Sequence, residues 1–141
     1  MSVTVQSLAA IHAEAYEHPW SAEDMAGMLH QDGVLHLGND DAFLLLRVVA
    51  DESEILTLAV RPSARRQGLA ALLVTAALGM ARGMGAKFTF LEVATDNLAA
   101  IALYEKAGFK RHGTRRGYYA RKGAPPADGL LMRCELNTPT G

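Results

Sequence analysis

The sequence predicts an α/β (α+β mixed) domain, in which about four helices flank one mixed, mostly antiparallel sheet that contains a single parallel pair. The segment from residue 54 to residue 94 reads as a strand, a long helix and a second strand, an order that makes the two strands parallel through a right-handed crossover. The other expected strands are joined too closely for such a crossover and should be antiparallel. The 141 residues suffice for a hydrophobic core, and we expect residues 1–141 to form a single domain with a flexible tail at 137–141.

The N-terminal part is expected to be helical after one short strand. The strand is predicted near residues 3–5, and apolar residues then recur at helical spacing. Pro19 breaks this helix. Ser21 can cap the next helix, because its hydroxyl can accept a bond from a free backbone amide, and Glu23 and Asp24 place negative charge in the first turn.

Three strands and a long helix are expected in the middle of the chain. The strands are predicted at residues 34–37, 42–49 and 54–60, and a proline ends the last of them. The helix that follows ends at Gly83 and Gly85. Its expected buried stripe has apolar residues at helical spacing, namely Leu69, Leu72, Leu73, Ala76, Ala77, Met80 and Met84.

The last part of the chain predicts a strand, a helix and a closing pair of strands. Residues 87–94 read as a buried strand. Asn97, or the aspartate before it, can cap the next helix, and Gly108 suits the C-terminal cap. Strands near residues 109–119 and 130–136 are separated by a Gly-Ala-Pro-Pro loop.

Charge is distributed unevenly, although the formal net charge is −1. Residues 1–60 contain ten acidic groups and one basic group, whereas residues 61–141 contain thirteen basic and five acidic groups. This asymmetry predicts an anionic ligand on the C-terminal half and a cationic one near the N-terminal half. The alternative is a set of solvated faces whose charges cancel in the fold.

Several classes of function are disfavoured. The pI is mildly acidic and no nucleic-acid-binding motif appears, so direct nucleic-acid binding is not expected. No apolar run approaches the roughly 20 residues that span a bilayer, and the N-terminus lacks the pattern of a signal peptide. The five histidines show no metal-ligand spacing, so we expect no metal and place the histidines at the surface or in caps. Cys134 is expected to be a buried structural thiol, and a single cysteine fits a cytoplasmic location.

The turn between residue 60 and the long helix has the features of an anion site. The first amides of a helix lack internal partners and the helix dipole is positive there, so such an end binds phosphate readily. Gly68 lets the backbone approach a ligand, and Arg61, Arg65 and Arg66 can add charge-assisted hydrogen bonds. An ordinary strand-to-helix turn with exposed arginines would carry the same residues.

Linked motifs in a fixed order resemble the GNAT N-acetyltransferase superfamily. Residues 54–70 look like the fourth strand, the acyl-carrier turn and the third helix of that superfamily. Further motifs follow at the family's spacing, namely Leu91-Glu92-Val93, Asn97, residues 100–109 and residues 115–119. Together with His18-Pro19-Trp20-Ser21 they resemble the RimI type, the ribosomal-protein alanine N-acetyltransferases. The likeness runs from about residue 8 to residue 136.

The resemblance implies acetyl-coenzyme A as cosubstrate, bound where the parallel pair of strands lies. Family members splay these two strands apart, which frees backbone amides for the ligand. Ala94 replaces the arginine that usually follows the Leu-Glu-Val triplet, and Gly129 replaces the usual alanine before the final strand. The positions implied to hold the cosubstrate are Leu58, Ala59, Val60, Arg65, Arg66, Gln67, Gly68, Leu69, Ala70, Ala71, Asn97 and Tyr104.

Acetyl transfer to an amine needs a base for the amine and an acid for the leaving thiolate. Glu92 is the candidate base, directly or through a water, because Phe88, Phe90 and Glu92 alternate onto one strand face and the phenyl rings should desolvate the carboxylate. Tyr104 is the candidate acid, because a phenol stays protonated at neutral pH. Asn97 shares its helix face and can bond the pantetheine arm. A structural ion pair, a core tyrosine and a plain N-cap are the respective alternatives, and the resemblance favours the functional roles.

Three aromatic residues are candidates for contact with the acceptor. Tyr118 and Tyr119 precede the final hairpin, which in the family closes over the peptide. Packing within the strand is the alternative for both. Trp20, with Pro19, is a candidate for the opposite wall of the groove, and a buried staple between two helices is the equal alternative.

The expected function is transfer of an acetyl group from acetyl-CoA to the N-terminal α-amino group of a protein, by direct attack in a ternary complex. A basic ribosomal-protein tail would suit the acidic N-terminal half. Two alternatives remain: the same fold acting on a small-molecule amine, and a non-catalytic acetyl-CoA-binding regulatory module. The presence of both Glu92 and Tyr104 argues against the module. We expect a monomer or a weak dimer, without contact to nucleic acid or membrane.

Overall fold

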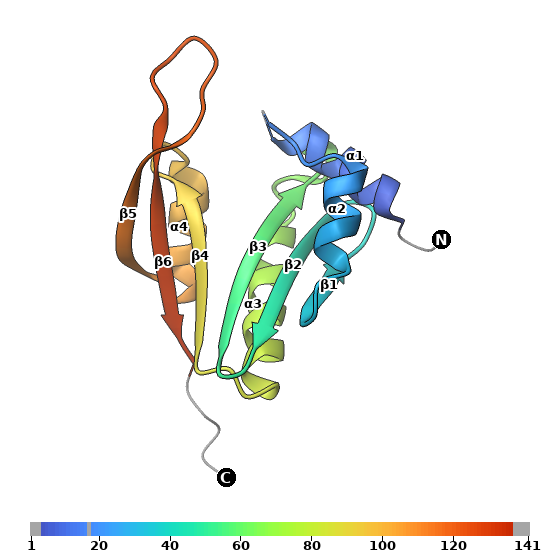
Figure 1. The fold of residues 1–141 in the computed structure, drawn as a ribbon, viewed down its shortest axis with the longest axis vertical. Helices are drawn as coiled ribbons and strands as arrows, with labels where there is room; N and C mark the ends of the chain where they lie inside the picture. The colour runs from blue at the N-terminus through green and yellow to red at the C-terminus, as the bar shows by residue number, and fades with distance from the viewer. Residues whose placement is uncertain (1–3, 17, 137–141) are drawn as a thin grey trace.

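The computed structural model describes residues 4–16 and 18–136, and its centre is a six-stranded sheet (Figure 1). Along the sheet the strands follow the order β1-β2-β3-β4-β6-β5. Only β3 and β4 are parallel, so the predicted sheet with one parallel pair is confirmed. The strands are β1 (Val34–Gly38), β2 (Ala42–Val49), β3 (Glu52–Val60), β4 (Phe88–Ala94), β5 (Lys110–Tyr119) and β6 (Ala127–Glu135).

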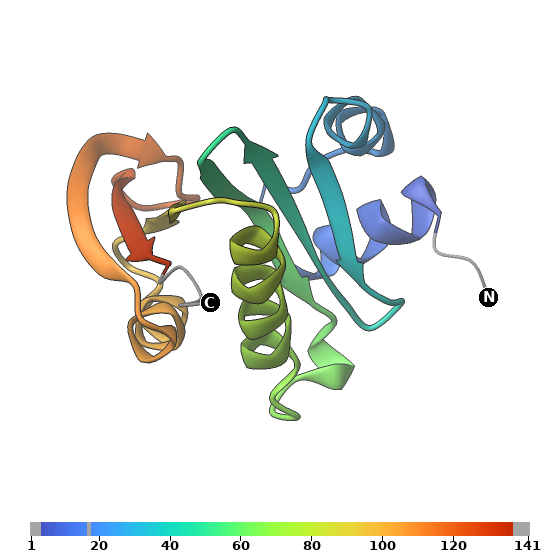
Figure 2. The ribbon, with the colours of Figure 1, turned by 90° about the horizontal axis from the view of Figure 1, so that it is seen from below.

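Two pairs of helices cover opposite faces of the sheet (Figure 2). Helices α1 (Val5–Ala15) and α2 (Ala22–Leu29) lie on one face, and α3 (Leu69–Gly83) and α4 (Leu98–Ala107) lie on the other. Phe43 and Leu45 of β2 pack with α1 and α2, whereas Leu44 and Leu46 pack with α3 and α4, because successive side chains of a strand point to opposite faces. In the part of the chain that the structure describes, no helix is long and apolar enough to cross a membrane.

The start of the chain differs from the predicted order of elements. The strand expected near residues 3–5 is wrong at Val5, which is the first residue of α1. Residues 1–3 and the predicted tail at 137–141 lie outside the described part of the chain. Thr4 caps α1, because its hydroxyl accepts a bond from the Ser7 amide at 3.1 Å and the Ser7 hydroxyl accepts one from the Thr4 amide. Ser21 caps α2 in the same way, which confirms the predicted cap.

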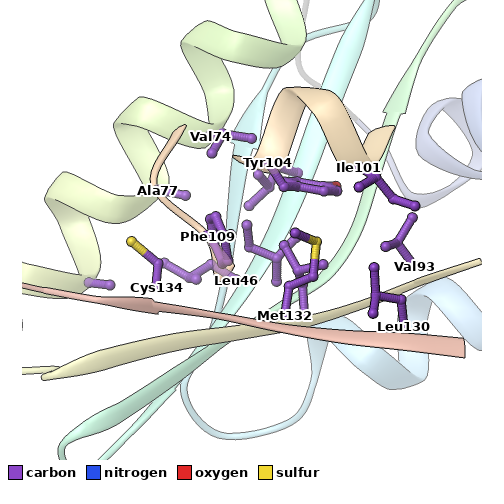
Figure 3. Packing of buried hydrophobic residues seen from close by; sticks show 14 of the residues in the cluster. Leu46, Val74, Ala77, Val93, Ile101, Tyr104, Phe109, Leu130, Met132 and Cys134 are labelled. Carbon is purple, nitrogen blue, oxygen red and sulfur yellow. The ribbon is translucent and has the colours of Figure 1, made fainter. Parts of the chain in front are cut away.

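The buried face of α3 agrees with the predicted stripe at Leu73 and Ala77 and differs from it elsewhere. Leu72 and Met80 are 65% and 41% exposed, whereas Val74, Ala77 and Ala81 are buried against the sheet. When most residues of a helix are apolar, the spacing of the apolar residues is compatible with more than one buried face. Small side chains occupy the contact because they allow the helix to lie close to the strands, as Val74 and Ala77 show in Figure 3.

The larger core lies between the sheet and the helices α3 and α4 (Figure 3). Met132 and Cys134 of β6 reach it from the sheet, and Tyr104 of α4 reaches it from the helix layer. Cys134 is 7% exposed, and burial raises the pKa of its thiol, so the predicted buried structural thiol is confirmed. Gly108 ends α4 at φ 109°, the left-handed conformation expected of a helix C-terminal cap.

Candidate active site

Strands β3 and β4 pair over only the first part of their length. The parallel register ends at Glu54 and Phe90, although both strands continue beyond these residues. Past this point the two strands diverge, while β3 stays paired with β2 on its other side (Figure 1). The edge of β3 that faces the opening carries Leu58, Ala59 and Val60, the residues predicted to face the acyl carrier.

The turn before α3 has a backbone geometry that suits an anion. Gly68 is the N-terminal cap with φ 76°, and Arg66 also has a positive φ of 66°, a conformation that lets successive backbone N–H groups converge. No side chain caps this helix, so the amides of Leu69, Ala70 and Ala71 keep no side-chain acceptor among the described residues. These amides and the positive end of the helix dipole can hold phosphate.

Two of the three arginines expected near this turn remain available for a ligand. Arg65, Arg66 and Gln67 are exposed, and neither guanidinium forms an ion pair within residues 4–16 and 18–136. Arg61 instead binds Glu14 on α1, with 3.2 Å between Nε and Oε2. Arg61 therefore ties the end of β3 to α1, and its part in the anion site stays a prediction.

Asn97 begins α4 as its N-cap. The side-chain oxygen accepts a hydrogen bond from the Ala100 amide at 3.2 Å, so the plain capping role is present. The side-chain nitrogen of Asn97 donates to no described residue, which leaves two N–H groups for a ligand. A contact with the pantetheine arm stays a prediction.

Tyr104 lies deep in the core formed with α3 and α4. It is 7% exposed and meets Phe109 edge to face at 5.6 Å, so the predicted core position is present (Figure 3). Burial, with smaller contributions from Tyr16 and Tyr119, raises the pKa of Tyr104 above its usual range. The phenol therefore stays protonated, and its hydroxyl donates to no described side chain or backbone group.

Glu92 points to the face of the sheet opposite Tyr104. Its neighbours Leu91 and Val93 pack into the core under α3 and α4, so Glu92 projects to the other side. The side chain is 16% exposed and its Oε1 lies 3.2 Å from Nε of Arg115, the ion pair considered as an alternative. Gly129 leaves room for this carboxylate, because a Cβ at that position would lie 3.0 Å from Cδ of Glu92.

A groove of about 750 Å³ opens on the same face as Glu92. Glu92, Arg115 and Tyr118 line one part of it, and further residues of β2, β3, β4, β6 and the turn after α2 line the rest. Four carboxylates and two guanidinium groups take part, so the formal charge of the lining is −4 + 2 = −2. These charged residues are Asp32, Glu52, Glu54, Glu92, Arg47 and Arg115.

The two tyrosines at the end of β5 differ in burial. Tyr118 is 52% exposed and lies under the guanidinium of Arg115, 4.5 Å from the ring centre. Tyr119 is partly buried, and its hydroxyl donates to the backbone carbonyl of Glu92 at 3.3 Å. Burial, followed by the Glu92 carboxylate, raises the pKa of Tyr119 to about 12. Both side chains therefore lie beside Glu92, and their contact with an acceptor stays a prediction.

The connection between β5 and β6 is tied to the start of α4. Arg121 makes two hydrogen bonds with the carboxylate of Asp96, at 2.7 and 2.8 Å, and lies 5.7 Å from the ring centre of Tyr119. Its hydrogen bonds lower the pKa of Asp96. Asp128 accepts a hydrogen bond from the Gly117 amide at 2.8 Å within the same hairpin. These contacts place Tyr119 at the gap.

A buried histidine organises the other side of the gap, and the sequence interpretation missed it. His12 is 2% exposed, and its Nδ1 accepts the backbone N–H of Trp20 at 3.0 Å, which assigns the proton to Nε2, 3.0 Å from Oγ1 of Thr57. Burial lowers the pKa of His12 to about 4. The predicted surface or cap role is wrong for this histidine. Its spacing of four residues from the buried Leu8 is the signal that could have found it.

Tyr16 also contributes to the site without having been predicted. Its ring stacks on His12 at 4.2 Å, and its hydroxyl donates to the backbone carbonyl of Leu58 at 2.6 Å. Trp20 stacks on His12 at 5.1 Å and packs with the core of α1 and α2. The packing role considered for Trp20 is therefore present, and its contact with a substrate stays a prediction.

These features define an enzyme of the group-transfer class. A helix start suited to phosphate follows β3, the parallel strands open beside it, and two side chains suited to proton transfer approach from opposite faces. Among residues 4–16 and 18–136, no three His, Cys, Asp or Glu side chains come together as metal ligands. The chain matches the acetyltransferase (GNAT) family over residues 5–109 and belongs to that family.

Its relatives within the family include bacterial N-acetyltransferases. The [ribosomal protein bS18]-alanine N-acetyltransferase of Escherichia coli (strain K12) is 36% identical over 130 residues, which cover 86% of this chain and 82% of that protein. The N-alpha-acetyltransferase RimI of Mycobacterium tuberculosis (strain H37Rv) is 34% identical over 128 residues, which cover 91% of this chain and 72% of that protein. The crystal structure of the Escherichia coli ribosomal-protein-S18-alanine N-acetyltransferase superposes with a TM-score of 0.87 at 30% identity, covering 94% of this chain and 88% of that one. The resemblance to the RimI type is confirmed.

Proposed function

We propose that this protein transfers the acetyl group of acetyl-CoA to the N-terminal α-amino group of a protein, by direct attack in a ternary complex. The observation that carries the proposal is the opening between β3 and β4, which begins after Glu54 and Phe90. A thioester and an amine can meet there from opposite faces of the sheet. Membership of the acetyltransferase family and the names of the relatives support the same reaction.

Acetyl-CoA would lie on the side of α3 and α4. The turn from Arg65 to Ala71 would hold the pyrophosphate through backbone amides and the guanidinium groups of Arg65 and Arg66. Leu58, Ala59 and Val60 would hold the pantetheine arm with the unpaired edge of β3, and the side-chain nitrogen of Asn97 would add a hydrogen bond. The donor side of the site therefore uses mostly backbone groups, which suits a carrier that all family members share.

The reaction replaces the C–S bond of the thioester with a C–N bond and moves a proton from the nitrogen to the sulfur. The amine nitrogen attacks the carbonyl carbon, a C–N bond forms, the C–S bond breaks and coenzyme A leaves as a thiolate. Glu92 accepts the proton that the nitrogen loses, directly or through a water. Tyr104 donates its phenolic proton to the departing thiolate, which becomes the thiol of coenzyme A, and the proton taken by Glu92 restores the phenol through solvent. Because the pKa of Tyr104 is raised, its side chain remains the phenol until that moment. The products are the acetylated amide and coenzyme A.

The acceptor would approach from the face that carries the Glu92 groove. The lining of this groove has a formal charge of −2, so a segment with positive charge after its N-terminus should bind more tightly. The relatives from Escherichia coli act, by their name, on the alanine of ribosomal protein bS18. We propose a basic protein tail, such as that of a ribosomal protein, as the natural acceptor.

Steady-state rates with acetyl-CoA test the proposal. An alanine-leading basic peptide should be acetylated with higher kcat/KM than a panel of small amines, and mass spectrometry should place the acetyl group on the α-nitrogen. Raising the salt concentration should raise the KM of the basic peptide and leave that of a neutral alanine-leading peptide nearly constant. Higher rates on a small amine would instead support the small-molecule alternative, and acetyl-CoA binding without any turnover would support the regulatory module.

Two variants test the assigned chemistry. Glu92→Gln keeps the size of the side chain and removes the base, and Tyr104→Phe keeps the ring and removes the hydroxyl. Each should lower kcat by about 100-fold or more, while the Kd for coenzyme A stays within about twofold. Wild-type rates in either variant would contradict that residue's role without affecting the acetyltransferase assignment.

A further inference from the structure

Two tyrosine hydroxyls lie on opposite sides of the gap, and each is bound to a backbone carbonyl of the strand beside it. Tyr16, at the end of α1, donates to the carbonyl of Leu58 on β3 at 2.6 Å. Tyr119, at the end of β5, donates to the carbonyl of Glu92 on β4 at 3.3 Å. The two strands are the pair that diverges, so the hydroxyls flank the opening from both sides.

This bonding fixes what the two phenols can offer to a ligand. A phenol has one proton to donate, and Tyr16 and Tyr119 both use it on a backbone carbonyl. Only lone pairs remain on the two oxygens, so both act as hydrogen-bond acceptors toward the gap. The nearby Glu92 carboxylate is an acceptor as well. The residues around the opening therefore suit a group with several N–H donors.

Tyr16 is held by more contacts than its 40% exposure would suggest. Its ring stacks on His12 at an interplanar angle of 16°, and both nitrogens of His12 are bound, one by Trp20 and one by Thr57. The histidine ring cannot turn without losing both bonds. The position of the Tyr16 hydroxyl is thus set by a rigid support on α1 rather than by a mobile surface side chain.

We propose that Tyr16 and Tyr119 together hold the acceptor amine, each accepting one of its N–H groups, and that Tyr16 is thereby a specificity-determining residue for primary amines. A neutral primary amine has two N–H donors and one lone pair. When both donors are bound by the phenolic oxygens, the lone pair is left to attack the thioester. Once the C–N bond has formed, one N–H leaves its phenolic oxygen and gives its proton to Glu92, directly or through a water. This inference rests on the proposed function. It gives Tyr16 a role separate from those of the acid Tyr104 and the base Glu92.

A cycle of four dissociation constants tests the inference. The peptides are an alanine-leading peptide and its propionyl analogue, which lacks only the amino group, and the proteins are the wild type and Tyr16→Phe, each saturated with coenzyme A. The wild type should bind the amino peptide more tightly than the analogue. Tyr16→Phe should lose about tenfold affinity for the amino peptide and little for the analogue, because one hydrogen bond to the amine is missing. Equal losses for both peptides would mean a merely structural role and would overturn the proposal.

A matched control separates this effect from a general loss of stability. Thr4→Ala removes the hydroxyl that accepts a hydrogen bond from the Ser7 amide at 3.1 Å and caps α1, at the opposite end of the helix from Tyr16. It should lower the free energy of unfolding as much as Tyr16→Phe and leave both peptide affinities unchanged. If the wild type binds coenzyme A but acetylates no peptide, the proposed function itself fails. If the wild type is active but Tyr16→Phe weakens the binding of both peptides equally, only the proposed role of Tyr16 fails.

Discussion

Acidification should destabilise this protein through His12. Its Nδ1 accepts a backbone N–H from Trp20, so a proton added to Nδ1 would place two donors against each other. The ring is 2% exposed, stacks on two other rings and, among the residues that the structure describes, reaches no carboxylate that could stabilise the charge. Burial accordingly lowers the pKa of His12 from 6.5 to about 4. The fold therefore tolerates only the neutral imidazole.

The sign and size of the effect follow from linkage. In the unfolded chain His12 titrates near its usual pKa of 6.5, so below that pH the unfolded state binds a proton that the folded state does not. Stability is fully present above the unfolded pKa, declines as the pH falls from 6.5 to about 4, and changes no further on this account below that. The total loss is about 3 kcal/mol, of which about 2 kcal/mol should have occurred at about pH 5.

Urea unfolding at about pH 7.5 and about pH 5 measures the loss. The wild type should lose about 2 kcal/mol more between these pH values than His12→Gln, because glutamine can keep one donor and one acceptor but does not titrate. His18→Gln is the matched control, since His18 is exposed, and it should behave like the wild type. Equal losses in the wild type and in His12→Gln would refute the reasoning.

Three further substitutions probe the two sides of the gap. Gly68→Ala meets no atom within 4 Å but must adopt φ 76°, so it should cost about 1–2 kcal/mol of stability and weaken acetyl-CoA binding in calorimetry; unchanged affinity would remove the turn from the site. Gly129→Ala should displace the Glu92 carboxylate by a few tenths of an ångström and lower kcat by about tenfold, with peptide Kd retained; a wild-type kcat would show that this placement is not critical. Arg121→Gln should loosen Tyr119 and raise the peptide KM several-fold with little change in Tm, and an unchanged KM would contradict the anchoring role.

Local sequence patterns predicted the connectivity of the fold because each rests on short-range physics. Ser21 and Gly108 mark helix ends by the hydrogen bonds and backbone angles that such ends require. The predicted strand near residues 3–5 is wrong at Val5, because Thr4, the N-cap of α1, was read as part of an extended chain. The buried face of α3 failed for another reason: tertiary packing selected small side chains over large ones, and periodicity alone does not contain that choice.

In the site, too, residues in local sequence motifs were predicted, and residues placed by tertiary contacts were not. Glu92 and Tyr104 were found through motifs at fixed spacing, and the structure puts them on opposite faces of the sheet. Tyr16 and His12 were missed, because each bonds a residue of β3 more than 40 positions away along the chain, Leu58 and Thr57 respectively. The ion pair of Arg61 with Glu14 was also not predicted, because it depends on how α1 packs against the sheet.

The opening between β3 and β4 has an identifiable origin in the strand itself. The register of β2 and β3 shifts where Leu45 faces Thr57 and Leu46 faces Ile55, so one residue of β3, Leu56, has no partner. An unpaired residue of this kind bends a strand and increases its twist. The shift comes directly after Glu54, where pairing with β4 stops, so β3 can turn away from β4 while keeping its bonds to β2. Paired strands lie only about 4.8 Å apart, too close for a thioester to pass, and the bulge therefore makes the proposed chemistry possible at this sheet.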